Sequence, residues 1–186
     1  MFMEIKLLIT DFDGTLVDTF QANYRAYCEA FEKVGLFLSE EQYRKCYGLR
    51  FDGFMTAIGI EDTDLRKRIQ TIKSECYPNY FSALCVNQPL LDFIRMFHRC
   101  GGMTAVASTA RSKNLLNALA HIGAKDDFDL ILAGEDVKDG KPSPEIYNTV
   151  MNRLGVSPSE TLVFEDSTVG LQAAKAAGTH FIKVNL

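Results

Sequence analysis

Short apolar runs recur along the chain, and segments with helical spacing separate the later ones. Continuous apolar runs of this length are typical of strands buried on both faces, as in parallel sheets. The segments between them each open with a capping residue or an N-terminal proline, as helices do. The alternation predicts an α/β fold, a parallel sheet covered by helices on both faces. The expected strands are Ile5–Thr10, Met103–Ser108, Leu130–Ala133, Thr161–Glu165 and His180–Leu186, with helices at Ser112–Ile122, Pro144–Leu154 and Thr168–Ala177.

The stretch from Thr19 to about Ala83 breaks this rhythm. It has helical periodicity without a strand-like run, so we expect a helical insertion between the first strand and the rest of the sheet. Residues 1–18 and 84–186 would then form the sheet-containing core, and residues 19–83 the insertion. The helices expected in the insertion and just after it are Phe20–Val34, Glu40–Tyr47, Phe51–Ile58, Thr63 towards Tyr77, and Pro89–Arg99.

The composition of the chain argues against some classes of binding partner and indicates a cellular compartment. Of the 186 residues, 47% are hydrophobic, enough for a sizeable core, and the formal net charge of −4 argues against broad nucleic-acid binding. The five cysteines are scattered without a Cys-x-x-Cys pair, which fits free thiols in a reducing compartment. The N-terminal segment to Thr10 lacks the apolar stretch of a signal peptide. We therefore expect a soluble, cytoplasmic protein that binds neither nucleic acid nor membrane.

Polar residues that could take part in catalysis or ligand binding follow the ends of the predicted strands. In a parallel sheet these ends meet at one edge, where α/β proteins bind their ligands. Acidic groups, a hydroxyl and a lysine are therefore predicted to converge at that edge. The residues are Asp11, Asp13 and Gly14 after the first strand, Ser108 and Thr109 after the second, Lys141 after the third, and Glu165 and Asp166 at the fourth.

This pattern resembles the haloacid dehalogenase-like superfamily, whose signature is four motifs in this order. The resemblance covers the whole chain and implies a Rossmann-like core with an inserted helical cap, close to beta-phosphoglucomutase and phosphoglycolate phosphatase. It also implies a magnesium-dependent enzyme acting on a small phosphorylated metabolite. The matching segments are Asp-Phe-Asp-Gly-Thr-Leu-Val-Asp from Asp11, Ser108, Gly-Lys-Pro-x-Pro around Lys141, Phe-Glu-Asp-Ser around Glu165, and Gly170–Gly178.

The resemblance implies catalytic roles for two aspartates. Asp11 would attack phosphorus and form an aspartyl-phosphate. Asp13 would protonate the leaving oxygen and later deprotonate the attacking water, so its carboxyl must start protonated. The Asp11 side chain, the Asp13 backbone carbonyl and Asp166 would hold Mg²⁺, with Glu165 as a further or water-mediated partner.

Three other groups would hold the phosphoryl oxygens. By resemblance these are Ser108, the backbone amide of Thr109 and Lys141, while Gly14 lets the backbone approach closely. A nucleophilic carboxylate meets a phosphate dianion only if cations neutralise the charge, which Mg²⁺ and Lys141 would do. Structural alternatives stay open: Asp13-Gly14 as a turn, Ser108 as a helix cap, and Lys141 as a solvated loop residue.

Two arginines are candidates for substrate contact. Arg50 lies between two helices of the insertion, where related enzymes place a specificity loop, and Arg111 follows Ser108 closely. A guanidinium pairs well with a second carboxylate or phosphate of a substrate. The alternative for both is an ordinary surface arginine.

The leading interpretation is a phosphatase. A sugar phosphomutase of the beta-phosphoglucomutase type is the alternative enzyme, because that branch shares the cap and all four motifs. A binding or regulatory protein that has lost turnover is the alternative from another class. Loss of Asp11, Asp13, Lys141 or Asp166 would be its signature, and all four are present.

Overall fold

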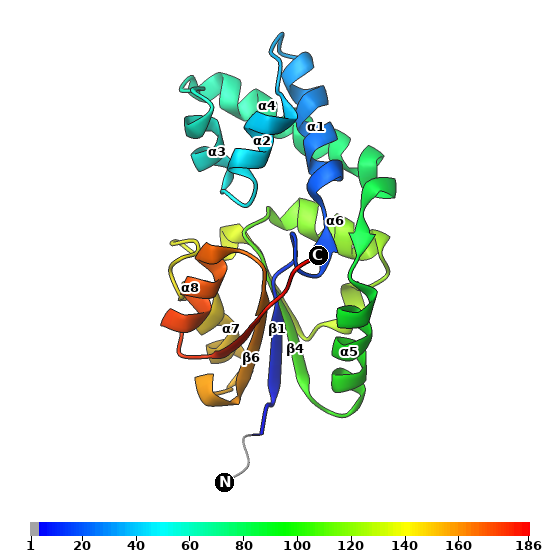
Figure 1. The fold of residues 1–186 in the computed structure, drawn as a ribbon, viewed down its shortest axis with the longest axis vertical. Helices are drawn as coiled ribbons and strands as arrows, with labels where there is room; N and C mark the ends of the chain where they lie inside the picture. Colours follow the sequence, from blue (N-terminus) through cyan, green and yellow to red (C-terminus); the bar gives the residue numbers. More distant parts are fainter. Residues whose placement is uncertain (1–3) are drawn as a thin grey trace. The chain divides into compact units, whose positions relative to one another are not determined.

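A computed structural model describes residues 4–186, and within them the chain divides into two compact units. The residues up to Asp18 together with Val86–Leu186 form one unit, here called the sheet unit (Figure 1). Thr19–Cys85 forms the other, the helical unit. Met1–Met3, which begin the N-terminal segment without signal-peptide character, lie outside the described residues.

The sheet unit is built on a parallel sheet, as the sequence predicts. Within residues 4–186 the sheet has five strands in the order β5-β4-β1-β6-β7, and all of its neighbouring pairs are parallel. The register aligns Thr10 at the end of β1 with Val106 and Phe164 on its neighbours. The strands are β1 (Leu7–Thr10), β4 (Met103–Ala107), β5 (Leu130–Leu132), β6 (Thr161–Glu165) and β7 (His180–Lys183).

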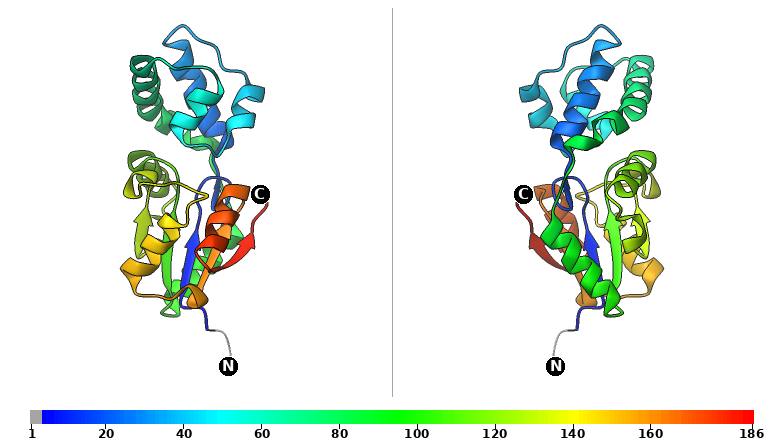
Figure 2. Two further views of the ribbon diagram at one scale, coloured as in Figure 1. Left: turned by 90° about the vertical axis from the view of Figure 1, so that its left-hand side faces the viewer. Right: turned by 90° about the vertical axis from the view of Figure 1, so that its right-hand side faces the viewer.

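Helices cover both faces of this sheet. Figures 1 and 2 show α7 (Glu145–Leu154) and α8 (Thr168–Ala176) on one face, and α5 (Gln88–Arg99) and α6 (Ser112–His121) on the other. The predicted α/β fold, with a helical region between β1 and β4, is confirmed. Short 3₁₀ segments not foreseen in the sequence lie at η2 (Lys125–Asp127), η3 (Gly134–Asp136) and η4 (Pro158–Glu160).

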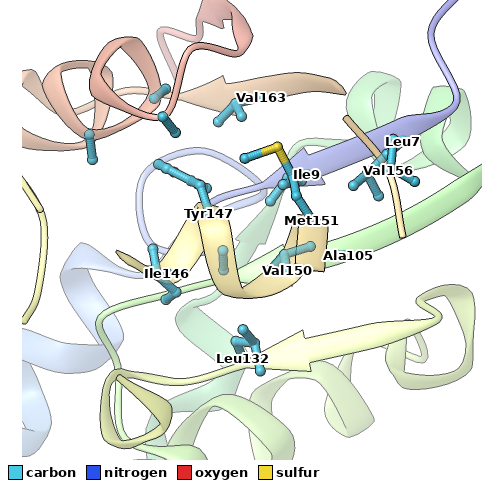
Figure 3. Packing of buried hydrophobic residues seen from close by; sticks show 14 of the residues in the cluster. Leu7, Ile9, Ala105, Leu132, Ile146, Tyr147, Val150, Met151, Val156 and Val163 are labelled. Carbon is cyan, nitrogen blue, oxygen red and sulfur yellow. The ribbon is translucent and has the colours of Figure 1, made fainter. Parts of the chain in front are cut away.

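Alternation along the strands decides which face each side chain packs on. Leu7 and Ile9 of β1 join the cluster formed with Tyr147, Val150 and Met151 of α7 (Figure 3). On the opposite face the ring of Phe164 in β6 packs edge-on against Phe93 of α5, with centroids 6.0 Å apart. The strands are therefore buried from both sides, which explains their continuous apolar runs.

The helical unit contains α1 (Phe20–Glu32), α2 (Glu40–Cys46), α3 (Phe51–Ala57), α4 (Thr63–Cys76) and the 3₁₀ segment η1 (Tyr77–Ala83). Local sequence sets the helix starts: Ser39 and Gln42 form a capping box at α2, and Asp62 caps α4. Phe31, Phe54 and Ile69 are buried in a core of its own. Two short strands, β2 (Val17–Asp18) and β3 (Cys85–Val86), pair where the chain enters and leaves this unit.

None of the helices within residues 4–186 combines the length and the apolar character needed to cross a lipid bilayer.

An ion pair at the amino-terminal end of β6 makes stability depend on pH. Glu160 accepts hydrogen bonds from Lys6 and Ser157, which lower the pKa of its carboxyl from about 4.5 to about 2. A depressed carboxyl pKa gives stability that is present above the unfolded-state value and lost as pH falls towards the folded-state value. We therefore expect Glu160→Gln to lower the free energy of unfolding at pH 7, and the difference from wild type to shrink towards pH 3.

Urea unfolding of both proteins at several pH values measures this difference. Glu61→Gln, at an exposed position between α3 and α4, is the control and should stay close to wild type at every pH. A Glu160→Gln deficit of equal size at pH 7 and pH 3 would contradict the expectation.

Candidate active site

The predicted site residues of the sheet unit lie at the carboxyl ends of its strands. Asp11 directly follows β1, Ser108 directly follows β4, and Glu165 ends β6. Lys141 comes from the loop between β5 and α7. Since the strands are parallel and aligned in register, these positions fall at the same edge of the sheet.

Lys141 links the first and the last of these strand ends. Its Nζ donates hydrogen bonds to Asp11 Oδ1 at 2.6 Å, to Glu165 Oε1 at 2.5 Å and to the carbonyl of Ala107 at 3.0 Å. The side chain is only 2% exposed, so the alternative of a solvated loop lysine is wrong. Burial by itself lowers the pKa of Lys141, but Asp11, Tyr147 and Glu165 outweigh burial and hold it well above its usual value.

Glu165 is fully buried and hydrogen-bonded through both carboxylate oxygens. The hydroxyl of Tyr147 donates to Oε1 at 3.1 Å, and the amide and hydroxyl of Ser167 donate to Oε2, each at 3.0 Å. A Cβ on Gly170 of α8 would lie 1.8 Å from Glu165 Oε1, so only glycine leaves room for this carboxylate. This arrangement orients Glu165 towards Lys141.

The sequence patterns do not identify Tyr147 and Gly170 as residues that support the site. Both lie inside segments that these patterns singled out, one shortly after the Gly-Lys-Pro-x-Pro motif and the other at the start of the tail segment. An aromatic residue on a helix is expected to pack in the hydrophobic core, and Tyr147 does belong to the core cluster in Figure 3. Its hydroxyl reaches Glu165, and the Lys141 ammonium lies over its ring, 5.2 Å from the centroid.

Asp11 is a buried carboxyl in a crowded electrostatic environment. Burial is the main cause that raises the pKa of Asp11 well above its usual value, and the charges of Glu165 and Asp13 add to the increase. Lys141 acts in the opposite direction. A further cation at this position would therefore favour the ionised form of Asp11.

Asp166 completes an acidic group that fits a divalent cation. Ligand oxygens of Asp11, Glu165 and Asp166 all lie within 4.8 Å of one another. Thr15 Oγ1 donates to Asp166 Oδ1 at 2.8 Å and fixes that carboxylate. Burial is the main cause that raises the pKa of Asp166, and the charge of Glu165 adds to the increase. Oxygen donors of this kind suit a hard ion such as Mg²⁺.

The position after Asp13 requires glycine for two reasons, its backbone conformation and its closeness to Asp166. The φ of +88° at Gly14 is unfavourable for other residues, and the Gly14 amide donates to the Val17 carbonyl at 2.8 Å in a tight turn. A Cβ there would lie 2.5 Å from Asp166 Oδ2. The sequence alternative of a turn at Asp13-Gly14 is thus correct in itself, and the turn also brings the backbone against Asp166.

The Ser108 hydroxyl contacts both Asp13 and the loop that follows β4. It donates to Asp13 Oδ2 at 3.4 Å and accepts the Ala110 amide at 3.0 Å. The N-cap of α6 is Arg111, so the alternative in which Ser108 caps this helix is wrong. Thr109, whose backbone amide is also predicted to hold phosphoryl oxygens, directly follows Ser108.

The two arginines are placed differently. Arg111 donates from Nε to Glu135 Oε1 at 2.9 Å, and its side chain is 49% exposed. Arg50 is the N-cap of α3 in the helical unit. Substrate contact by either residue stays a prediction.

Comparison with known proteins agrees with the motifs. The family profile described as haloacid dehalogenase-like hydrolase matches residues 8–184. The chain is 31% identical, over 94% of its length and 82% of the relative, to a phosphorylated carbohydrates phosphatase of Thermotoga maritima. Among solved structures, CbbY from Rhodobacter sphaeroides in complex with phosphate matches with a TM-score of 0.89 and 29% identity, covering 98% of this chain and 87% of that one.

A beta-phosphoglucomutase from Clostridium difficile shares the fold, with a TM-score of 0.81 and 23% identity over 98% of this chain and 85% of its own.

Proposed function

Because this chain belongs to the haloacid dehalogenase-like hydrolase family, we propose that it is a magnesium-dependent phosphatase that hydrolyses a small phosphorylated sugar. The observation that carries the proposal is the buried Asp11–Lys141–Glu165 group beside Asp166, where a carboxylate nucleophile is held next to a lysine. The likeness to a phosphatase of phosphorylated carbohydrates supports the class of substrate.

The acidic group supplies the ligands that a metal needs. The carboxylates of Asp11 and Asp166 and the backbone carbonyl of Asp13 would hold Mg²⁺, and Glu165 would hold Lys141 in place. When bound, Mg²⁺ neutralises charge on the phosphoryl group and helps to orient it. Two unit charges about 4 Å apart interact by roughly 4 kcal/mol at an effective dielectric of 20, so cations decide whether a dianion can approach Asp11.

The reaction divides into two displacements at phosphorus. In the first, a carboxylate oxygen of Asp11 bonds to phosphorus while the bond from phosphorus to the sugar oxygen breaks, and Asp13 gives that oxygen its proton. In the second, Asp13 takes a proton from water, whose oxygen bonds to phosphorus and releases Asp11 and inorganic phosphate. Ser108 Oγ lies 3.4 Å from Asp13 Oδ2, so the Asp13 carboxyl is next to a proposed phosphoryl-binding group.

Ser108, the Thr109 amide and Lys141 would bind the phosphoryl oxygens during both steps. Lys141 has the least freedom of these groups, since its ammonium is already fixed by Asp11, Glu165 and the Ala107 carbonyl. A preorganised charge stabilises the transition state more than a charge that must rearrange during the reaction.

The helical unit would act as the cap. Its separate core supports movement as one body, and its chain connections at Asp18 and Val86 are the natural hinges. Arg50 would meet a second anionic group of the substrate. A closing cap excludes water from the first displacement and selects the sugar.

Removing the metal is expected to stop turnover. With a panel of hexose and pentose monophosphates, phosphate release should fall to background in excess EDTA and return when Mg²⁺ exceeds the chelator. The measurement is phosphate release over time, with circular dichroism as the control that the protein stays folded. Release that persists in EDTA would contradict a metal-dependent enzyme.

The same panel separates the phosphatase from its alternatives. A phosphomutase would convert one sugar phosphate into an isomer without net phosphate release, which ³¹P NMR detects. A folded protein that binds Mg²⁺ but changes none of the compounds would favour a binding or regulatory protein.

A further inference from the structure

We infer that Glu135 is a positioning residue that holds the phosphoryl-binding turn, defined here as Ser108–Ser112. The inference rests on the proposed function, because that function gives Ser108 and Thr109 the phosphoryl oxygens. Glu135 lies in η3, shortly after β5 ends at Leu132, and therefore reaches the turn from the neighbouring strand of the sheet. It touches neither metal ligands nor substrate groups in the proposed mechanism.

The Glu135 carboxylate binds the far end of the turn with both oxygens. Oε2 accepts the Ser112 amide at 2.6 Å, and Oε1 accepts Arg111 Nε at 2.9 Å. Ser112 is the first residue of α6, so its amide is one of those that the helix itself cannot satisfy. Glu135 therefore caps α6 from another loop and ties the end of the turn to β5.

Gly134 holds the middle of the turn. Its amide donates to the Ala110 carbonyl at 2.9 Å, and a Cβ on Gly134 would lie 2.5 Å from the Thr109 carbonyl oxygen. Only glycine lets the two backbones approach this closely. The amide of the same Ala110 donates to Ser108 Oγ at 3.0 Å, so the contact continues to the hydroxyl that would bind phosphate.

The charge of Glu135 suits this task. Burial alone would raise its pKa, but the bonds from Ser112 and Arg111 outweigh burial and lower it. The carboxylate is thus ionised at neutral pH, and charge-assisted hydrogen bonds are shorter and stronger than neutral ones. In this arrangement Arg111 stabilises the turn through Glu135.

The consequence for catalysis follows from geometry. Phosphoryl oxygens are held by groups at the start of the turn, and displacement of such groups by a fraction of an ångström weakens binding and turnover. Loss of the Glu135 carboxylate frees the Ser112 amide and the Arg111 guanidinium together. The turn should then move more, although every group that contacts the substrate is still present.

The test uses Glu135→Ala, Glu135→Gln and a matched control, Glu160→Ala. Like Glu135, Glu160 accepts a hydrogen bond from one backbone amide, that of Ser157, and pairs with one cationic side chain, that of Lys6. Glu160 precedes β6, however, whereas the site residue Glu165 lies at the other end of that strand. Two quantities are measured in the full-length protein: amide hydrogen exchange over residues 108–112, and the inhibition constant of inorganic phosphate with Mg²⁺ during hydrolysis of a sugar phosphate.

Glu135→Ala should speed exchange in the turn and raise both KM and the phosphate inhibition constant by about tenfold, which reflects displaced binding groups. Glu135→Gln should recover part of the loss, because its amide oxygen can still accept the Ser112 amide. Glu160→Ala should stay within about twofold of wild type in both constants.

Two outcomes would overturn the inference: unchanged exchange at residues 108–112 in Glu135→Ala, or inhibition constants equal to those of Glu160→Ala. Failure of the proposed function looks different, because wild-type protein would then release no phosphate. In that case exchange in the turn, together with phosphate binding measured by calorimetry, decides the role of Glu135 by the same criteria.

Discussion

Asp11→Asn is expected to reduce phosphate release by about 10⁴-fold or more, the scale typical of losing a nucleophile. An amide oxygen is a poor nucleophile and a weak metal ligand, so both the aspartyl-phosphate and one of the proposed Mg²⁺ contacts are lost. Binding of the substrate should suffer less than kcat, because Lys141, Ser108 and the Thr109 amide remain.

The same variant should be at least as stable as wild type in the absence of metal. Burial and neighbouring carboxylates raise the folded-state pKa of Asp11 above its unfolded value. For a carboxyl, a raised folded-state pKa means that ionisation weakens the fold, increasingly so as pH rises from the unfolded towards the folded pKa. Asparagine removes this cost, and its side-chain oxygen can still accept the hydrogen bond from Lys141.

Single-turnover kinetics and thermal unfolding check the two halves of this expectation. Asp11→Ala is the companion variant, because it cannot regain the carboxylate by deamidation. Turnover of Asp11→Ala close to the wild-type rate would exclude Asp11 as the nucleophile. A large loss of stability in Asp11→Asn would mean that the ionised carboxylate holds the fold together.

Lys141→Met is expected to lower the free energy of unfolding by about 3–5 kcal/mol, the usual cost of removing one partner of a buried ion pair. The Lys141 ammonium lies between Asp11 and Glu165, and both side chains are almost completely buried. Without the ammonium, Glu165 keeps its hydrogen bonds from Tyr147 and Ser167 but loses its counter-charge. Phosphate release should also fall to background.

A double-mutant cycle tests this explanation. Glu165→Gln in the Lys141→Met background removes the uncompensated charge, so it should restore part of the lost stability. The control is Lys45→Met, which breaks the exposed pair with Glu41 and should change stability little. The expectation fails if the second substitution adds to the loss, because Glu165 would then stabilise the fold independently of Lys141.

The type and order of the elements could be predicted from the sequence because their signals are local. A buried strand must be apolar along its length, and helix starts such as Ser39 and Asp62 are set by nearby side chains. The break in rhythm after Thr19 likewise marks the helical unit, whose structural boundaries are Asp18/Thr19 and Cys85/Val86.

The edge of the sheet that carries the site also follows from the sequence. Once the strands are parallel, polar residues that follow them must come to the same edge, and that is where Asp11, Ser108 and Glu165 lie. The motifs then point to haloacid dehalogenase-like chemistry, and the family assignment is confirmed. The individual catalytic roles remain predictions.

Only the tertiary structure decided which groups support these residues. The contacts of Lys141 with Glu165, of Tyr147 with Glu165 and of Glu135 with Ser112 join residues far apart in the sequence. Their formation depends on strand order and on close approach, of two backbones at Gly134 and of the Glu165 carboxylate to the backbone at Gly170. Apolar periodicity shows which side of an element is buried but carries no information about which polar group another loop brings to it.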